Sequence, residues 1–136
     1  MKKAAGILVT SNGKCLLCKR NTNGSLPGEW SVPAGKIEKG ENILNAALRE
    51  FYEETDIELT EPLKFIGVIK RYNREGTKQT GLMYVFKYET EDQIIPDLVN
   101  AKDGQEHTEC GYFSKEKIPT PMNEPFKNLI LKNLSR

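Results

Sequence analysis

The chain has 136 residues, with 20 lysine or arginine and 19 aspartate or glutamate residues, and a formal net charge of +1. This length suits about one domain with a substantial core, and we expect residues 1–136 to form a single domain. The balanced charge gives no general case for binding nucleic acid. No apolar run approaches the roughly 20 residues of a membrane span. The apolar run 4–9 is not followed by the small-residue site at which a signal peptide would be cleaved. We therefore expect a cytoplasmic protein without membrane or nucleic-acid partners.

In chain order, alternating and apolar segments between turn signals predict a set of short strands. These strands cover residues 3–10, 14–19, 30–32, 63–72, 81–88 and 110–113. Gly, Pro, Asn and Asp residues predict loops or turns between them, at 21–28, 33–36, 73–76 and 90–104. The Asn12-Gly13 pair between the first two strands is typical of a β-hairpin.

Two helices are predicted among these strands. Asn42 is a suitable N-cap for a helix that we expect to end near Thr55. Apolar residues at helical spacing predict a second, amphipathic helix over 124–134. A mixed sheet with at least two helices places the chain in the α/β (α+β) class.

The three cysteines predict no disulfide framework, because they are few and odd in number. Cys15 and Cys18 have C-x-x-C spacing, but residues i and i+3 of a strand point to opposite faces. We expect reduced, mostly buried thiols at Cys15, Cys18 and Cys110, with no zinc or redox role.

The first helix carries an unusual acidic edge. Glu50, Glu53 and Glu54 fall within one arc of ~100° on a helix, next to an apolar face. That apolar face comprises Leu44, Ala47, Leu48 and Phe51. Adjacent like charges destabilise a bare helix, and a divalent metal held by carboxylate oxygens would offset them. A solvated acidic face is the alternative, and the spacing of the glutamates alone does not exclude it.

The wider pattern resembles the Nudix hydrolase box. Its characteristic positions are matched in register by Gly35, Glu41, Arg49, Glu50, Phe51, Glu53, Glu54 and Ile57. The box covers residues 35–57, and weaker similarity extends over 26–35 and 112–114. Asp56 replaces the final glycine of the motif. Because that glycine follows the helix, where a left-handed residue is often needed, Asp56 should cost modest stability and leave the carboxylates intact.

The resemblance implies an α/β/α sandwich around a mixed sheet, and an enzyme that uses Mg²⁺, with Mn²⁺ as the alternative ion. Glu53 and Glu54 would be the principal metal ligands, and Glu50 a ligand or the general base. Arg49 would orient a box carboxylate, so that Glu50, Glu53 and Arg49 form the catalytic set.

Further ligands are expected outside the helix. The resemblance implies that the backbone carbonyl of Ala34 reaches the metal, provided that Ala34 does not adopt a positive φ. A carboxylate from the loop 103–109 should also bind the metal. Glu106 is favoured over Glu109, which is also a candidate for substrate contact. The alternative is that these loop acids have no functional role. The neighbouring His107 is expected at the surface.

The implied substrate is a nucleoside diphosphate linked to another moiety. Lys19 and Arg20 either contact phosphate or only solubilise a strand end. Residues 121–125 resemble a stretch of MutT-type enzymes, in which Asn123 would read a purine edge, although Asn123 is also a good N-cap for the last helix.

Three functions follow from the resemblance. The favoured one is a MutT-like pyrophosphohydrolase that converts a nucleoside triphosphate to the monophosphate and pyrophosphate. The second is a pyrophosphatase for ADP-ribose, nucleotide sugars or dinucleoside polyphosphates. The third is a nucleotide sensor without turnover, acting as a monomer or homodimer like the other two.

Overall fold

The computed structural model describes residues 1–21, 28–60, 62–73 and 75–134. Its elements are β1 (Lys2–Ser11), β2 (Lys14–Arg20), β3 (Trp30–Ser31), β4 (Ala34–Lys36), α1 (Ile43–Thr55), β5 (Lys64–Tyr72), β6 (Gln79–Glu89), η1 (Gly104–Glu106), β7 (His107–Ser114), η2 (Lys115–Lys117) and α2 (Glu124–Asn133). The predicted loop over 21–28 and the turn at 73–76 lie partly outside the described residues. No helix within the described ranges is both long and apolar enough to cross a membrane.

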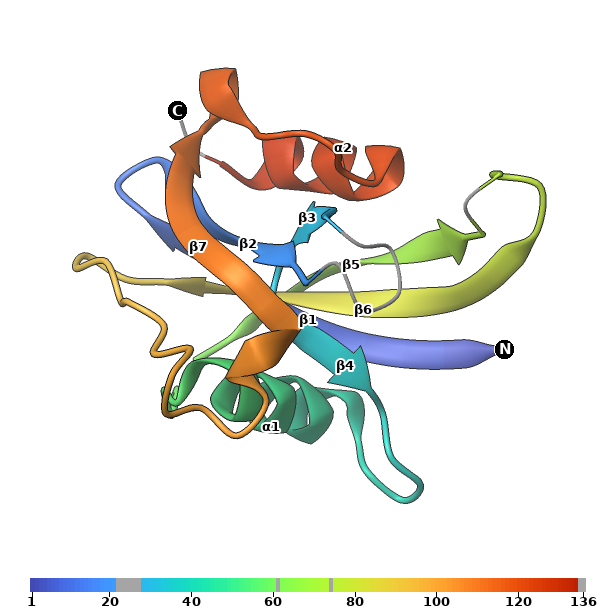
Figure 1. The fold of residues 1–136 in the computed structure, drawn as a ribbon, viewed down its shortest axis with the longest axis horizontal. Coiled ribbons are helices and arrows are strands. Elements are labelled where there is room, and N and C mark those ends of the chain that lie inside the picture. The colour runs from blue at the N-terminus through green and yellow to red at the C-terminus, as the bar shows by residue number, and fades with distance from the viewer. Residues whose placement is uncertain (22–27, 61, 74, 135–136) are drawn as a thin grey trace.

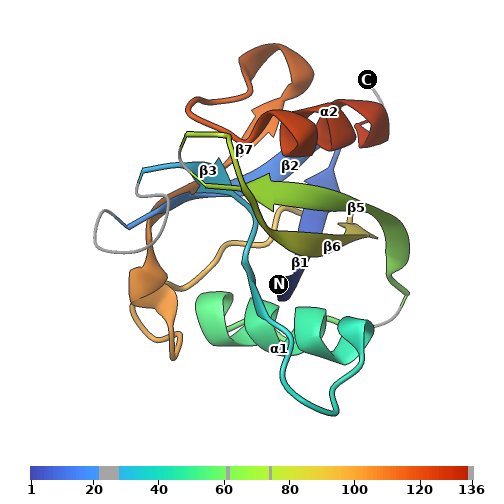
Figure 2. The same ribbon diagram turned by 90° about the vertical axis from the view of Figure 1, so that its right-hand side faces the viewer.

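A seven-stranded mixed sheet forms the centre of the fold. The strand order is β3-β2-β1-β6-β5, with β4 paired to β1 and β7 paired to β2. The β1–β6 pairing is parallel and the other pairings are antiparallel. Helices α1 and α2 lie on opposite sides of this sheet (Figures 1 and 2). The expected sandwich around a mixed sheet is therefore confirmed.

Alternation along the strands divides the core between the two faces. In β1, Leu8 joins the cluster beneath α2, whereas Ile7 and Val9 join the cluster beneath α1. The α2 side is completed by Phe126 and Ile130, both almost fully buried. The α1 side contains Phe51, and Leu44 and Leu48 pack against it as the helical spacing predicted.

Local turn chemistry agrees with the predicted hairpin. Asn12 and Gly13 both adopt positive φ, 51° and 81°, as a tight turn between β1 and β2 requires. The predicted turn at 33–36 is wrong in part, because Ala34–Lys36 forms the short strand β4 and pairs with β1. This pairing depends on a partner some thirty positions away in sequence, which composition does not reveal.

The cysteine prediction also requires correction. Cys18 and Cys110 are directly opposite each other in the β2–β7 pairing, and they are joined as a disulfide. Cys15 remains a buried free thiol, as expected. The opposing position of Cys18 and Cys110 follows from strand register, which the C-x-x-C spacing does not encode.

The two ends of α1 are capped as the sequence predicts. The Asn42 side chain accepts a hydrogen bond from the Asn45 backbone at 2.8 Å. Asp56 follows the helix with φ 64° and ψ 23°, and its backbone N–H donates to the Tyr52 carbonyl. The left-handed conformation at this position explains why the related motif uses glycine there.

Replacing Asp56 with glycine should raise the free energy of unfolding by up to about 1 kcal/mol, because glycine adopts the left-handed conformation without steric cost. Asp56→Ala should lower it by a similar amount. Chemical denaturation of the three proteins measures both changes. A lower stability for Asp56→Gly than for Asp56→Ala would contradict this account of the cap.

Candidate active site

Arg49 connects three of the four glutamates that match characteristic positions of the box. Its Nη1 donates to Glu50 at 2.8 Å and to Glu53 at 3.1 Å. Its Nε and Nη2 hold the two oxygens of Glu41 at 2.7 and 3.0 Å. The guanidinium group suits this position because its donors lie in a fixed planar fork. The hydrogen bonds to Arg49 lower the pKa of Glu41 to about 2.

The same arginine also fixes the connection between β4 and α1. Arg49 Nη2 donates to the Lys36 carbonyl at 3.0 Å, and the Glu38 backbone N–H donates to Glu41 at 3.0 Å. Gly35 lies so close to α1 that a side chain there would overlap the carboxyl group of Glu50. The motif residues Gly35, Glu41 and Arg49 therefore position Glu50 and Glu53.

Glu54 lies beside Glu50, on the buried side of α1. Its Oε1 faces His107 Nε2 at 2.7 Å and accepts from the Ala34 backbone N–H at 3.2 Å. Both side chains of the Glu54–His107 pair are 1% exposed. Burial, together with Glu50 and Glu106, raises the pKa of Glu54 to about 10. Burial and then Arg20 lower the pKa of His107 to about 4, so both groups favour their neutral forms.

The connection 90–106 is tied to α1 by main-chain hydrogen bonds. The Asp97 N–H donates to the Thr55 carbonyl at 2.9 Å, and the Asp103 N–H donates to the Glu53 carbonyl at 2.7 Å. These contacts satisfy carbonyl groups that the end of a helix leaves open. They also place Asp103 and Glu106 beside the acidic edge of α1.

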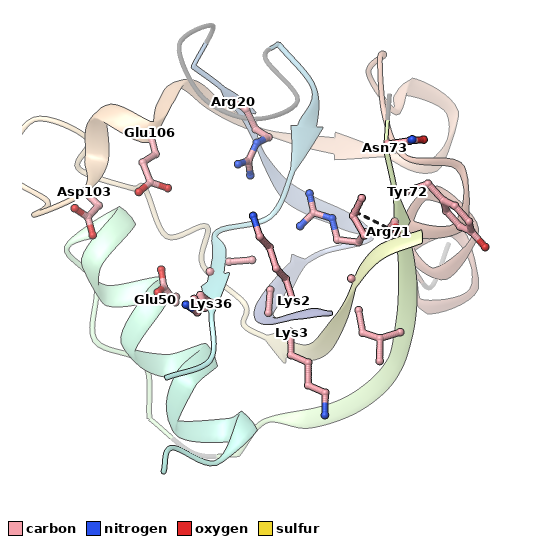
Figure 3. Close-up of a pocket in the computed structure, with 16 residues that line it drawn as sticks. Lys2, Lys3, Arg20, Lys36, Glu50, Arg71, Tyr72, Asn73, Asp103 and Glu106 are labelled. Carbon is pink, nitrogen blue, oxygen red and sulfur yellow. Dashed lines mark hydrogen bonds between the residues drawn. The ribbon is translucent and has the colours of Figure 1, made fainter. Parts of the chain in front are cut away.

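A cavity of about 750 Å³ lies beside these groups. Figure 3 shows Glu50, Asp103 and Glu106 on one side of it, with Lys2, Arg20 and Arg71 toward the other. This volume lies within the range of small-molecule sites. Of the predicted site residues, Glu50, Ala34, Glu106 and Arg20 line the cavity.

The remaining predicted site residues lie elsewhere. Lys19 pairs with Glu109 across β2 and β7, and neither is among the cavity-lining residues. Asn123 caps α2 by accepting from the Phe126 N–H at 2.9 Å, which confirms its predicted capping role. His107 is buried, so its expected surface position is wrong.

The structure adds residues that the sequence analysis did not select, notably His107 as the partner of Glu54, and Lys2 and Arg71 in the cavity wall. No local motif marks them, because strand register brings them to the site. Ala34, by contrast, meets the condition set for its carbonyl, since the only non-glycine residues with positive φ in the described ranges are Asn12 and Asp56.

The donor groups suit a hard divalent cation, although they are not assembled into a ready site. Within the described ranges, no three Asp, Glu, His or Cys side chains converge as a ligand set. Arg49 holds Glu50 and Glu53, and carboxylates would have to turn away from it to bind an ion. Glu54 Oε2 is nevertheless buried without a hydrogen-bond partner among these residues. A cation near Glu50 and Glu54 would offset their repulsion and occupy this oxygen.

A comparison with family models matches the NUDIX domain over residues 1–134. Among curated proteins, the chain is 30% identical over 95 residues to the 8-oxo-dGDP phosphatase NUDT18 of Mus musculus, covering 70% of this chain and 27% of that protein. It is 25% identical over 138 residues to the RNA pyrophosphohydrolase of Bartonella bacilliformis, covering 88% of this chain and 81% of that protein.

Solved structures share the fold. A MutT NUDIX hydrolase from Burkholderia pseudomallei aligns with a TM-score of 0.79 at 22% identity, covering 98% of each chain. A MutT protein from Methanosarcina mazei aligns with a TM-score of 0.77, also at 22% identity, covering 96% of this chain and 91% of the other.

Replacing Arg49 with lysine should reduce divalent-metal-dependent turnover by about 10- to 100-fold, because one ammonium group cannot hold Glu41, Glu50 and Glu53 together. Circular dichroism should show a retained fold, and steady-state kinetics measures the loss. Unchanged turnover in Arg49→Lys would show that orientation of these carboxylates does not matter.

The raised pKa of Glu54 predicts a pH-dependent stability in EDTA. Folded Glu54 keeps its proton up to a pKa of about 10, whereas the unfolded chain loses it near 4.5. Its contribution to stability is therefore complete below about pH 4.5 and falls as the pH rises toward 10. Glu54→Gln keeps a neutral group, so at pH 8 in EDTA the variant should be more stable than wild type by roughly 1–3 kcal/mol.

Thermal unfolding with and without Mg²⁺ completes this test. Mg²⁺ should raise the midpoint of the wild-type protein, because a bound ion stabilises the folded state. The response should be much smaller for Glu54→Gln. An equal response of the two proteins would exclude Glu54 as a ligand of the ion.

Proposed function

Because the chain belongs to the NUDIX family of hydrolases, we propose that it hydrolyses the phosphoanhydride bond of a nucleoside diphosphate linked to another group, with Mg²⁺ as cofactor. The favoured reaction is MutT-like, converting a nucleoside triphosphate to the monophosphate and pyrophosphate. Mn²⁺ is the alternative ion. The curated relatives include proteins named as an 8-oxo-dGDP phosphatase, an RNA pyrophosphohydrolase and a nucleoside triphosphatase.

The observation that carries the proposal is that a set of carboxylates held by Arg49 lies beside a cavity in the size range of small-molecule sites. Glu50 belongs to both, because it is held by Arg49 and lines the cavity. The opposite wall supplies cationic side chains, including Arg20 and Arg71. Acidic groups can bind a metal and basic groups can bind phosphate, and metal-assisted cleavage of a phosphoanhydride bond uses both functions.

Each carboxylate has a role that follows from its position. Glu53 and Glu54 would hold the metal, together with the Ala34 carbonyl and Glu106. Glu50 is the box carboxylate that lines the cavity, so we assign it the orientation and deprotonation of the attacking water. When bound, the metal would neutralise phosphate charge and lower the pKa of a coordinated water.

The chain's own groups would complete the reaction. Arg49 contacts Glu50 and Glu53 and would orient them before an ion binds, and His107 faces Glu54 Oε1. Water attacks phosphorus, the bridging P–O bond breaks, and the leaving phosphate carries the negative charge. Lysine and arginine side chains in the cavity wall would stabilise that charge.

Glu53→Gln tests the reaction directly. It removes one negative charge from the proposed metal ligands, so Mg²⁺-dependent hydrolysis of nucleoside triphosphates should nearly disappear while the fold is retained. Glu58→Gln is the matched control, because Glu58 follows α1 and is exposed. Chromatography of the products should show the monophosphate and pyrophosphate. Full turnover by Glu53→Gln would rule out this metal assignment.

A further inference from the structure

The cavity is lined by more basic side chains than the proposed cleavage step requires. Its acidic lining residues are Glu50, Asp103 and Glu106, and its basic lining residues are Lys2, Lys3, Arg20, Lys36 and Arg71. The acids gather at α1 and η1. In Figure 3 the side chains of Lys2, Arg20 and Arg71 point toward one another, whereas Lys3 points away from them. The cavity therefore has an acidic end and a basic end.

Strand register explains how the basic end is built. In the β1–β6 pairing, Lys2 is opposite Gly81, and in the β5–β6 pairing Arg71 is opposite the same glycine. Directly opposed residues project from one face of a sheet. Lys2 and Arg71 therefore flank a position that has no side chain. A Cβ at Gly81 would collide with the Lys2 carbonyl, so glycine permits the close approach of β1 and β6 here, and all three residues line the cavity.

Arg71 lies close enough to Arg20 for the two positive charges to repel each other. Burial, and then the positive charge of Arg20, lower the pKa of Arg71, whereas Glu29 acts in the opposite direction. Glu29 also interacts with Arg20. One glutamate is thus shared by two guanidinium groups, with the Lys2 ammonium group nearby. A multivalent anion would relieve this repulsion, and guanidinium groups bind phosphate oxygens in pairs.

We propose that Lys2, Arg20 and Arg71 form an anion subsite that binds a phosphate group of the substrate remote from the bond being cleaved. The subsite rests on the proposed function, because the acidic end of the cavity holds the reacting phosphates. It selects substrates with a further phosphate beyond the cleaved diphosphate, namely nucleoside triphosphates and dinucleoside polyphosphates. Nucleotide sugars and ADP-ribose carry a neutral sugar there and offer no anion to the basic end of the cavity.

The first test measures binding without catalysis. Inorganic tripolyphosphate is titrated calorimetrically into the protein in EDTA, so that no metal and no turnover contribute. Arg71→Gln should weaken binding about tenfold or more, because a charge-assisted contact is lost. Lys70→Gln is the matched control, since Lys70 is exposed, adjacent to Arg71 in β5 and projects from the other face. Equal affinities of Arg71→Gln and Lys70→Gln would overturn the subsite.

Lys2→Gln gives an independent reading should Arg71→Gln fold poorly, because Lys2 is an exposed residue at the start of β1. It should also weaken tripolyphosphate binding, and an unchanged affinity would remove Lys2 from the subsite. Arg71→Lys should recover part of the lost affinity through its charge but not its paired contacts. No recovery would contradict a role for the positive charge.

The second test determines which class of substrate supplies the remote phosphate. With Mg²⁺, kcat/KM is compared for ATP, diadenosine tetraphosphate and ADP-ribose. Arg71→Gln should lower kcat/KM by about tenfold for ATP or for diadenosine tetraphosphate, whichever of them the protein cleaves. It should leave the value for ADP-ribose almost unchanged. An equal loss for all three would overturn the selectivity. If wild type cleaves none of them, the proposed function fails, whereas tripolyphosphate binding in EDTA still decides the subsite.

Discussion

The hydrogen bonds of Arg49 are the constraint on which the candidate site depends. One guanidinium group donates two hydrogen bonds to Glu41, contacts Glu50 and Glu53, and donates to the Lys36 carbonyl. Without it, adjacent carboxylates on one helix edge would repel each other and spread. The same set of bonds fixes the strand that brings Ala34 against Glu54, so the helix, the preceding loop and β4 form one unit.

Features of short range could be predicted from the sequence. The helix limits, both α1 caps and the acidic edge follow from spacing, from Asn42 and Asp56, and from 3.6-residue periodicity. The resemblance added Gly35 and Arg49, and the structure gives each a physical role. Asn123 shows a limit of such reasoning, because two roles were open and only the capping contact is observed.

Features of long range could not be predicted, because strand register determines them. His107 reaches Glu54 from 53 positions away, and Lys2 and Arg71 meet across Gly81 of an intervening strand. The Cys18–Cys110 disulfide and the β4 pairing have the same origin. A lone histidine and scattered lysines carry no periodic signal, so composition favours the surface for all of them.

The long connection between β6 and β7 has little regular structure, yet it is held at several points. The Glu91 carbonyl accepts from Ser11, the Ile94 carbonyl accepts from Tyr112, and the amides of Asp97 and Asp103 donate to α1. These attachments restrict the segment before any ligand arrives. Glu106 is thereby presented to the cavity in advance, and a nucleotide that binds there need not supply the free energy of ordering a loop.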